Sequence, residues 1–169
     1  MPDRETIERA RRDKREGKAP STQAGEFVRE EMDHIREGKH GARSTKQAIA
    51  IGLSKARRAG VKLPPPKKGT TSAKTRTTAR RDAAAGRSST ARKKQPSAKR
   101  SRAVTKALRR EGRGAASKSA LSRQARTAAS KRSAASRSAS ARKAAKTKGP
   151  RQRAAAARKA GRTRARRRR

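Results

Sequence analysis

The chain has 169 residues, of which 29% are hydrophobic, 1% aromatic and 38% charged, and its formal net charge is +41. Low apolar content with so high a charge excludes a large hydrophobic core, because burial cannot offset the entropy lost on ordering. The absence of cysteine excludes disulfides, thiolate metal sites and thiol nucleophiles.

The positive charge is concentrated in the C-terminal part of the chain. Residues 1–63 hold 16 Lys/Arg and 10 Asp/Glu, a net +6, whereas residues 64–169 hold 37 Lys/Arg against Asp82 and Glu111, a net +35. Such asymmetry indicates a polyanionic partner bound mainly by the second part. The sequence therefore divides into a charged N-terminal helix and linker at 1–20, a helical head at 21–63 and a basic tail at 64–169.

Two helices are predicted before residue 40. Residues 3–16 form a polar helix with Asp3 as N-cap and an i,i+4 pair of Glu5 and Arg9. The second helix is predicted to be capped by Ser21 or Thr22, to run to about residue 37 and to end with Gly38 at C′. Its apolar stripe consists of Ala24, Phe27, Val28, Met32 and Ile35.

Glu31 lies inside that stripe, so we expect it either at the rim or paired with a basic residue of a neighbouring helix. Glu31 and His34 also have the Glu-x-x-His spacing of di-iron bundles, but this motif occurs once and His40 is the only other histidine. We therefore predict no metal and no cofactor. No acid–base pair, nucleophile or phosphate-binding glycine loop indicates an enzyme.

A third helix is predicted from the capping box of Ser44 and Gln47 to Gly60. Gly52 lies on its apolar face and allows a partner helix to approach closely. Residues 21–63 thus predict a helical hairpin in an all-α head of two or three helices. Its few large apolar side chains make it marginal, so we expect self-association, a protein partner or a ligand to stabilise it.

The opposite face of this third helix is polar and basic. It could bind a nucleic-acid groove, remain solvated or contact another protein, and the sequence leaves these three interpretations open. The residues of this face are Lys46, Gln47, Ser54, Arg57 and Arg58.

The basic tail is composed mainly of Ala, Lys, Arg, Ser and Thr and is predicted to be intrinsically disordered, because like charges repel and little can be buried. Helix propensity is favourable in windows 98–111 and 152–160, which we expect to fold when phosphates neutralise them. With half of its charges engaged, the slope of log affinity against log salt should be about −15.

Binding by the tail should be sequence-neutral, because it holds no aromatic for base stacking and no Asn to read base edges. The residues expected to contact nucleic acid are Arg80, Arg81, Arg92, Lys93, Lys94, Lys99, Arg100, Arg109, Arg110, Lys131, Arg132, Arg142, Lys143, Arg158, Lys159, Arg166, Arg167, Arg168 and Arg169.

The segments FVREEMDHIREGKHG and KHGARSTKQAIAIGLSKARRAGVKLP, within about residues 21–64, resemble a family of small, uncharacterised bacterial proteins often labelled DNA-binding. The resemblance supplies no site residues. The tail is similar in composition to bacterial linker-histone-like proteins and linker-histone tails, but it is richer in arginine and ends in RTRARRRR.

These observations predict a non-enzymatic, histone-like protein that coats, condenses or bridges duplex DNA in the nucleoid of the cytoplasm. No secretory signal is recognised, and no apolar run approaches the ~18 residues of a membrane span. Two alternatives stay open: an RNA-associated structural protein of ribosomal type, and an adaptor whose head recruits a DNA-processing partner.

Overall fold

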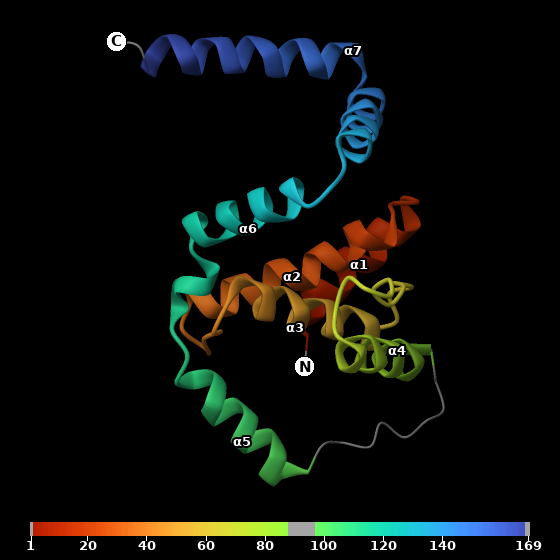
Figure 1. The fold of residues 1–169 in the computed structure, drawn as a ribbon, viewed down its shortest axis with the longest axis vertical. Coiled ribbons are helices and arrows are strands. Elements are labelled where there is room, and N and C mark those ends of the chain that lie inside the picture. The colour runs from red at the N-terminus through yellow and green to blue at the C-terminus, as the bar shows by residue number, and fades with distance from the viewer. Residues whose placement is uncertain (1, 88–96, 168–169) are drawn as a thin grey trace. The chain divides into compact units, whose positions relative to one another are not determined.

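The computed structural model describes residues 2–87 and 97–167, whose regular secondary structure is helical, with no strand among them (Figure 1). The chain forms two units, Met1–Gln124 and Ala125–Arg169. The helices are α1 Arg4–Arg15, α2 Pro20–Arg36, α3 Thr45–Arg58, α4 Ala73–Arg87, α5 Ala98–Arg109, the 3₁₀ turn η1 Arg113–Ala116, α6 Lys118–Ser130 and α7 Ala134–Arg167.

Helices α1, α2 and α3 pack side by side and contain most of the core (Figure 1). The apolar stripe of α2 faces its neighbours, with Phe27 1% and Ile35 0% exposed. Val61 and Leu63, which follow α3, pack back onto the cluster around Phe27. The helical hairpin predicted from the periodicity of α2 and α3 is therefore present.

The helix N-termini show which of the predicted capping interactions form. Ser44 caps α3 by accepting from the backbone N of Gln47 at 3.2 Å, as predicted. The Gln47 side chain accepts from the backbone N of Arg43 at 2.9 Å, one residue before the position that a capping box specifies. The prediction of a serine or threonine cap for α2 was wrong, because Pro20 occupies the first turn and Ala19 precedes it.

Gly52 lies where α3 crosses α2. A Cβ at this position would lie 2.7 Å from the Cα of Val28, so any side chain must push the two backbones apart. Gly25, on α2, is a matched control because a Cβ there meets nothing within 4 Å.

We expect Gly52→Ala to lower the free energy of unfolding by about 1–3 kcal/mol, since it overpacks a backbone contact. Gly25→Ala should raise it by about 0.5–1 kcal/mol, because alanine loses less entropy in a helix. Scanning calorimetry of the two variants measures the difference. A Gly52→Ala protein that melts no lower than the wild type would contradict the close helix packing.

The prediction that residues 64–169 are disordered was wrong: the described part of the tail forms α4, α5, η1, α6 and α7. Alanine, lysine and arginine favour helix locally, and helix hydrogen bonds need no hydrophobic core. Serines also cap several starts. Ser97 accepts from the backbone N of Arg100 at 3.3 Å, and Ser133 from that of Ser136 at 3.2 Å. Residues 88–96 and 168–169 lie outside the described part.

Two parts of the tail pack against the helices before them. In α4, Ala79 is 4% and Asp82 2% exposed, and α4 lies against α3. In η1, Ala116 is fully buried beside Met32 and Ile35. Backbone hydrogen bonds join the loop after α2 to the tail, from Gly41 N to Leu108 O at 2.9 Å and from Ala42 N to Gly112 O at 3.2 Å. The first unit therefore extends well beyond the three N-terminal helices.

Helix α7 bends at Gly149 and Pro150 (Figure 1). Gly149 has φ 68° and ψ 169°, a backbone conformation that only glycine adopts readily. Proline then starts the next helical segment, where its missing N–H costs nothing. Helix α7 thus consists of two helical segments, residues 134–148 and 150–167.

Candidate nucleic-acid interface

The second unit carries positive charge without any acidic residue to neutralise it. Residues 125–169 hold 18 Lys/Arg and no Asp/Glu. The Lys and Arg side chains that the structure describes in α7 are all exposed. A surface of this kind attracts polyanions strongly, because no internal ion pair competes with the partner.

The segment 150–167 of α7 has the densest charge. Its 18 residues span about 27 Å and hold eight Lys/Arg. That is about one charge per 3.4 Å, the phosphate spacing along one DNA strand. Five of these cations fall within an arc of about 100° on the helix, which we call the α7 basic face: Arg151, Arg158, Lys159, Arg162 and Arg166.

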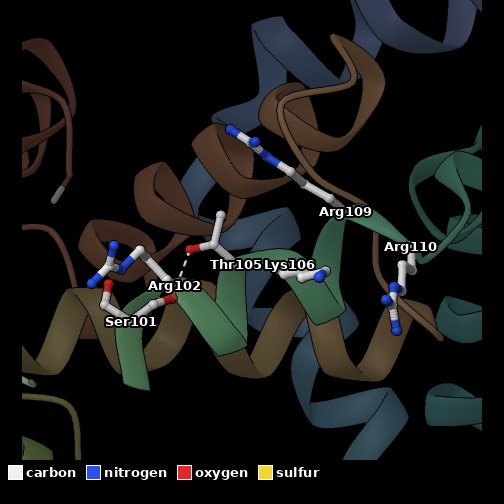
Figure 2. Close-up of a pocket in the computed structure, with 6 residues that line it drawn as sticks. All are labelled: Ser101, Arg102, Thr105, Lys106, Arg109 and Arg110. Carbon is white, nitrogen blue, oxygen red and sulfur yellow. Dashed lines mark hydrogen bonds between the residues drawn. The ribbon is translucent and has the colours of Figure 1, made fainter. Parts of the chain in front are cut away.

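Helix α5 carries a second basic surface, an open depression that is lined by cations and hydroxyl groups (Figure 2). The Thr105 hydroxyl donates to the backbone O of Ser101 at 3.0 Å. Arginine and lysine supply charge, and hydroxyl groups supply further hydrogen bonds, which together suit phosphate oxygens. The lining residues are Ser101, Arg102, Thr105, Lys106, Arg109 and Arg110.

The structure places the tail cations predicted from the sequence on several helices. Those with described side chains are all exposed: Arg80 and Arg81 on α4, Lys99, Arg100, Arg109 and Arg110 on or directly after α5, Lys131 and Arg132 between α6 and α7, and Arg142, Lys143, Arg158, Lys159 and Arg166 on α7. Arg167 ends α7. The predicted contacts Arg92, Lys93, Lys94, Arg168 and Arg169 lie outside the described residues.

Helix α4 packs against part of the predicted polar face of α3. The Asp82 carboxylate accepts from Ser54 Oγ at 2.6 Å and from Arg58 Nε at 2.8 Å. Arg57 is 7% exposed and donates to the backbone O of Pro64 at 3.2 Å. These three side chains therefore hold α3, α4 and the following loop together. Lys46 is exposed and Gln47 half-buried at the start of α3.

Burial also acts on the Arg57 guanidinium, whose Nε has no hydrogen-bond partner among the described residues. Burial lowers the pKa of Arg57 below its usual value, and the charge of Asp82 opposes this effect. Arginine stays protonated at physiological pH even so. Arg57 is thus a buried structural cation.

Glu30 and Glu31 form a buried acidic pair on α2, which explains why an acidic residue lies within the apolar stripe. The Lys55 ammonium of α3 lies 2.7 Å from Glu31 Oε2 and 3.1 Å from Glu30 Oε1. The side chain of Glu31 is 0% and that of Glu30 2% exposed. The expected pairing of Glu31 with a neighbouring helix is confirmed, whereas the participation of Glu30 and Lys55 was not predicted. The feature of the sequence that could have indicated the participation of Glu30 is its position directly before Glu31.

In the part of the chain that the structure describes, the fold is all-helical, and its C-terminal helices are rich in exposed Lys and Arg. Residues 4–68 match the model of a protein family of unknown function (DUF6496). The match agrees with the resemblance of residues 21–64 to an uncharacterised family and adds α1 to it. The family's description names no activity, so it supports neither DNA binding nor the likeness to linker histones. No curated protein and no solved structure matches the chain.

Within residues 2–87 and 97–167, no helix is both long enough and apolar enough to cross a bilayer.

Proposed function

We propose that this protein binds duplex DNA without sequence preference through its basic helices, and that it coats, condenses or bridges DNA in the nucleoid. The observation that carries the proposal is the positive charge of residues 125–169, which hold 18 Lys/Arg and no Asp/Glu, and whose Lys and Arg side chains are exposed wherever the structure describes them. Phosphate contacts of this kind supply essentially all of non-specific DNA affinity.

The helical form of the basic tail favours duplex DNA over duplex RNA. The major groove of B-DNA is about 12 Å wide and admits an α-helix. The major groove of A-form RNA is deep and narrow, so a helix cannot enter it. Phe27 is the only Phe, Tyr or Trp residue of the chain and is buried, so none of these side chains can stack on an unpaired base.

The composition of the same helices supports sequence-neutral binding. Asn is absent from the whole chain, and alanine makes up most of the uncharged residues of α7. Bidentate reading of adenine uses Asn or Gln, and Gln152 is the only such residue in α7. Arginine and lysine at these positions have phosphates as their main partners.

The test is binding of the full-length protein to mixed-sequence duplex DNA, with duplex RNA and single strands of the same sequence in parallel. If half of the 18 cations in residues 125–169 engage, the salt slope should be about −8. Affinity for duplex DNA should then fall by about 10³–10⁵-fold between about 50 and 200 mM salt. Fluorescence anisotropy measures both quantities.

Three outcomes of this experiment decide the proposal. Tighter binding of duplex DNA than of either RNA, with little dependence on sequence, supports it. Equal or tighter binding of RNA at the same salt would replace it by the RNA-associated alternative. Failure to bind any of these polymers at low salt would show that the protein is not a nucleic-acid-binding protein.

A further inference from the structure

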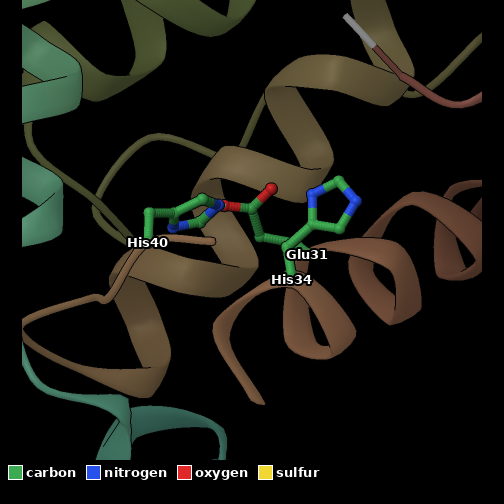
Figure 3. A group of neighbouring side chains, drawn as sticks. All are labelled: Glu31, His34 and His40. Atoms are coloured by element: carbon green, nitrogen blue, oxygen red, sulfur yellow. The ribbon is translucent and has the colours of Figure 1, made fainter. Parts of the chain in front are cut away.

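The buried carboxylate of Glu31 lies between two imidazole rings (Figure 3). Glu31 and His34 are one helical turn apart on α2, and the loop after α2 brings His40 to the same place. Each of the three residues offers one possible ligand atom, and these atoms all lie within 4.8 Å of one another. The two histidine rings meet edge to face with centroids 6.2 Å apart. They are the only histidines in the chain.

Both rings are oriented by a hydrogen-bond acceptor on their far side. His40 Nδ1 lies 3.1 Å from the backbone O of Gly41, and its Nε2 lies 3.2 Å from Glu31 Oε1. His34 Nε2 lies 3.3 Å from Asp3 Oδ2, which leaves Nδ1 as the nitrogen toward Glu31 (Figure 3). An oxygen acceptor behind each imidazole is the usual outer support of histidines that bind metal, since it fixes the tautomer.

The Glu31 carboxylate is available to a cation at one of its oxygens. The side chain is 0% exposed. Lys55 Nζ contacts Oε2 at 2.7 Å and His40 Nε2 contacts Oε1 at 3.2 Å. Neither contact has hydrogen-bond geometry, so both buried oxygens lack a hydrogen-bond partner among the described residues. Oε2 can keep Lys55 while Oε1 turns to an ion held with the two imidazoles.

The local charge favours a cation despite the net charge of the whole chain. Three carboxylates surround the site, those of Asp3, Glu30 and Glu31. Two ammonium groups partly balance them: Lys55, which contacts Glu30 and Glu31, and the exposed Lys39, which lies near Asp3 and Glu30. Asp3, Glu30 and His34 also bring ligand atoms within 4.8 Å of one another. This acidic cluster thus lies inside a protein with a net charge of +41.

We propose that Glu31, His34 and His40 form a binding site for a divalent cation of the zinc class. Two imidazoles and one carboxylate are a known three-ligand set for Zn²⁺, with water in the fourth position. Imidazole ligands favour zinc over magnesium or calcium, which prefer oxygen ligands alone. A bound ion would join the loop that carries His40 to α2.

The first test uses the full-length protein without an affinity tag and free of nucleic acid. Because the chain has two histidines, NMR of the imidazole nitrogens reports on each ring as Zn²⁺ is added. We expect both rings to shift together, with saturation at one ion per chain, and Mg²⁺ to shift neither. Absence of a shift in both rings would overturn the proposal.

The second test compares variants by competition with a chromogenic zinc chelator. His34→Gln and His40→Gln should each weaken Zn²⁺ binding by at least about 100-fold, because loss of an outer-shell partner already costs up to that much. Glu37→Gln removes an exposed carboxylate at the end of α2 and should leave the affinity unchanged. Unchanged affinity in both histidine variants, or equal weakening in all three, would overturn the site.

Discussion

Exchanging the five cations of the α7 basic face for glutamine is expected to flatten the salt dependence of duplex DNA binding by about 4 to 5 slope units. Removal of one phosphate contact lowers the slope by about 0.9, and five such removals correspond to about 10⁴-fold in affinity near 0.1 M salt. Glutamine has a helix propensity close to that of lysine and arginine, so α7 should persist. The exchanged residues are Arg151, Arg158, Lys159, Arg162 and Arg166.

The matched control removes the same charge from α1. Its five exchanged residues are also exposed, and both variants lower the net charge from +41 to +36. The control should change the slope by less than about one unit, because α1 lies in the part of the chain that is rich in acids. Equal decreases in the two variants would show that affinity follows net charge alone. The exchanged residues are Arg4, Arg11, Arg12, Lys14 and Arg15.

The three N-terminal helices could be predicted because their signals are local. The stripe of α2, the cap at Ser44 and the left-handed glycines Gly38 and Gly60, with φ 80° and 91°, all act within a few residues. Helices α4 to α7 were not predicted, because the low apolar content and high charge of the tail were taken to exclude stable structure. A helix of alanine with spaced cations needs only its own hydrogen bonds and caps.

The sequence predicted which residue types form the candidate site, but not which of these residues contact other elements of the fold. Exposed cations follow from composition, but the pairing of Ser54 and Arg58 with α4 depends on one acid, Asp82, 24 residues or more away. The meeting of His40 with Glu31 likewise depends on how the loop after α2 folds. Contacts between separate elements have no periodic signature in a single sequence.

Replacing Lys55 with methionine is expected to lower the free energy of unfolding by about 3–5 kcal/mol. The change leaves Glu30 and Glu31 buried without their ammonium partner, although methionine fills a similar volume. Chemical denaturation of the full chain measures the decrease. Lys46→Met, an exposed change on the same helix, should stay within about 0.5 kcal/mol.

Adding Glu31→Gln to Lys55→Met should recover part of this stability, because it removes one uncompensated buried charge. A double variant as unstable as the sum of the two single variants would show that the residues act separately. That result would contradict the ion cluster and reduce Lys55 to a packing residue.

The pH dependence of the wild type and Lys55→Met separates charge from packing. Burial lowers the pKa of Lys55, but the adjacent carboxylates of Glu31 and Glu30 outweigh it, so the pKa lies above the ordinary 10.5. The stabilisation is therefore complete below pH 10.5 and is lost as the pH rises through the raised pKa. The difference in melting temperature between wild type and Lys55→Met should shrink at strongly alkaline pH. A difference that stays constant there would mean that the methylene stem of Lys55, rather than its charge, stabilises the contact between α2 and α3.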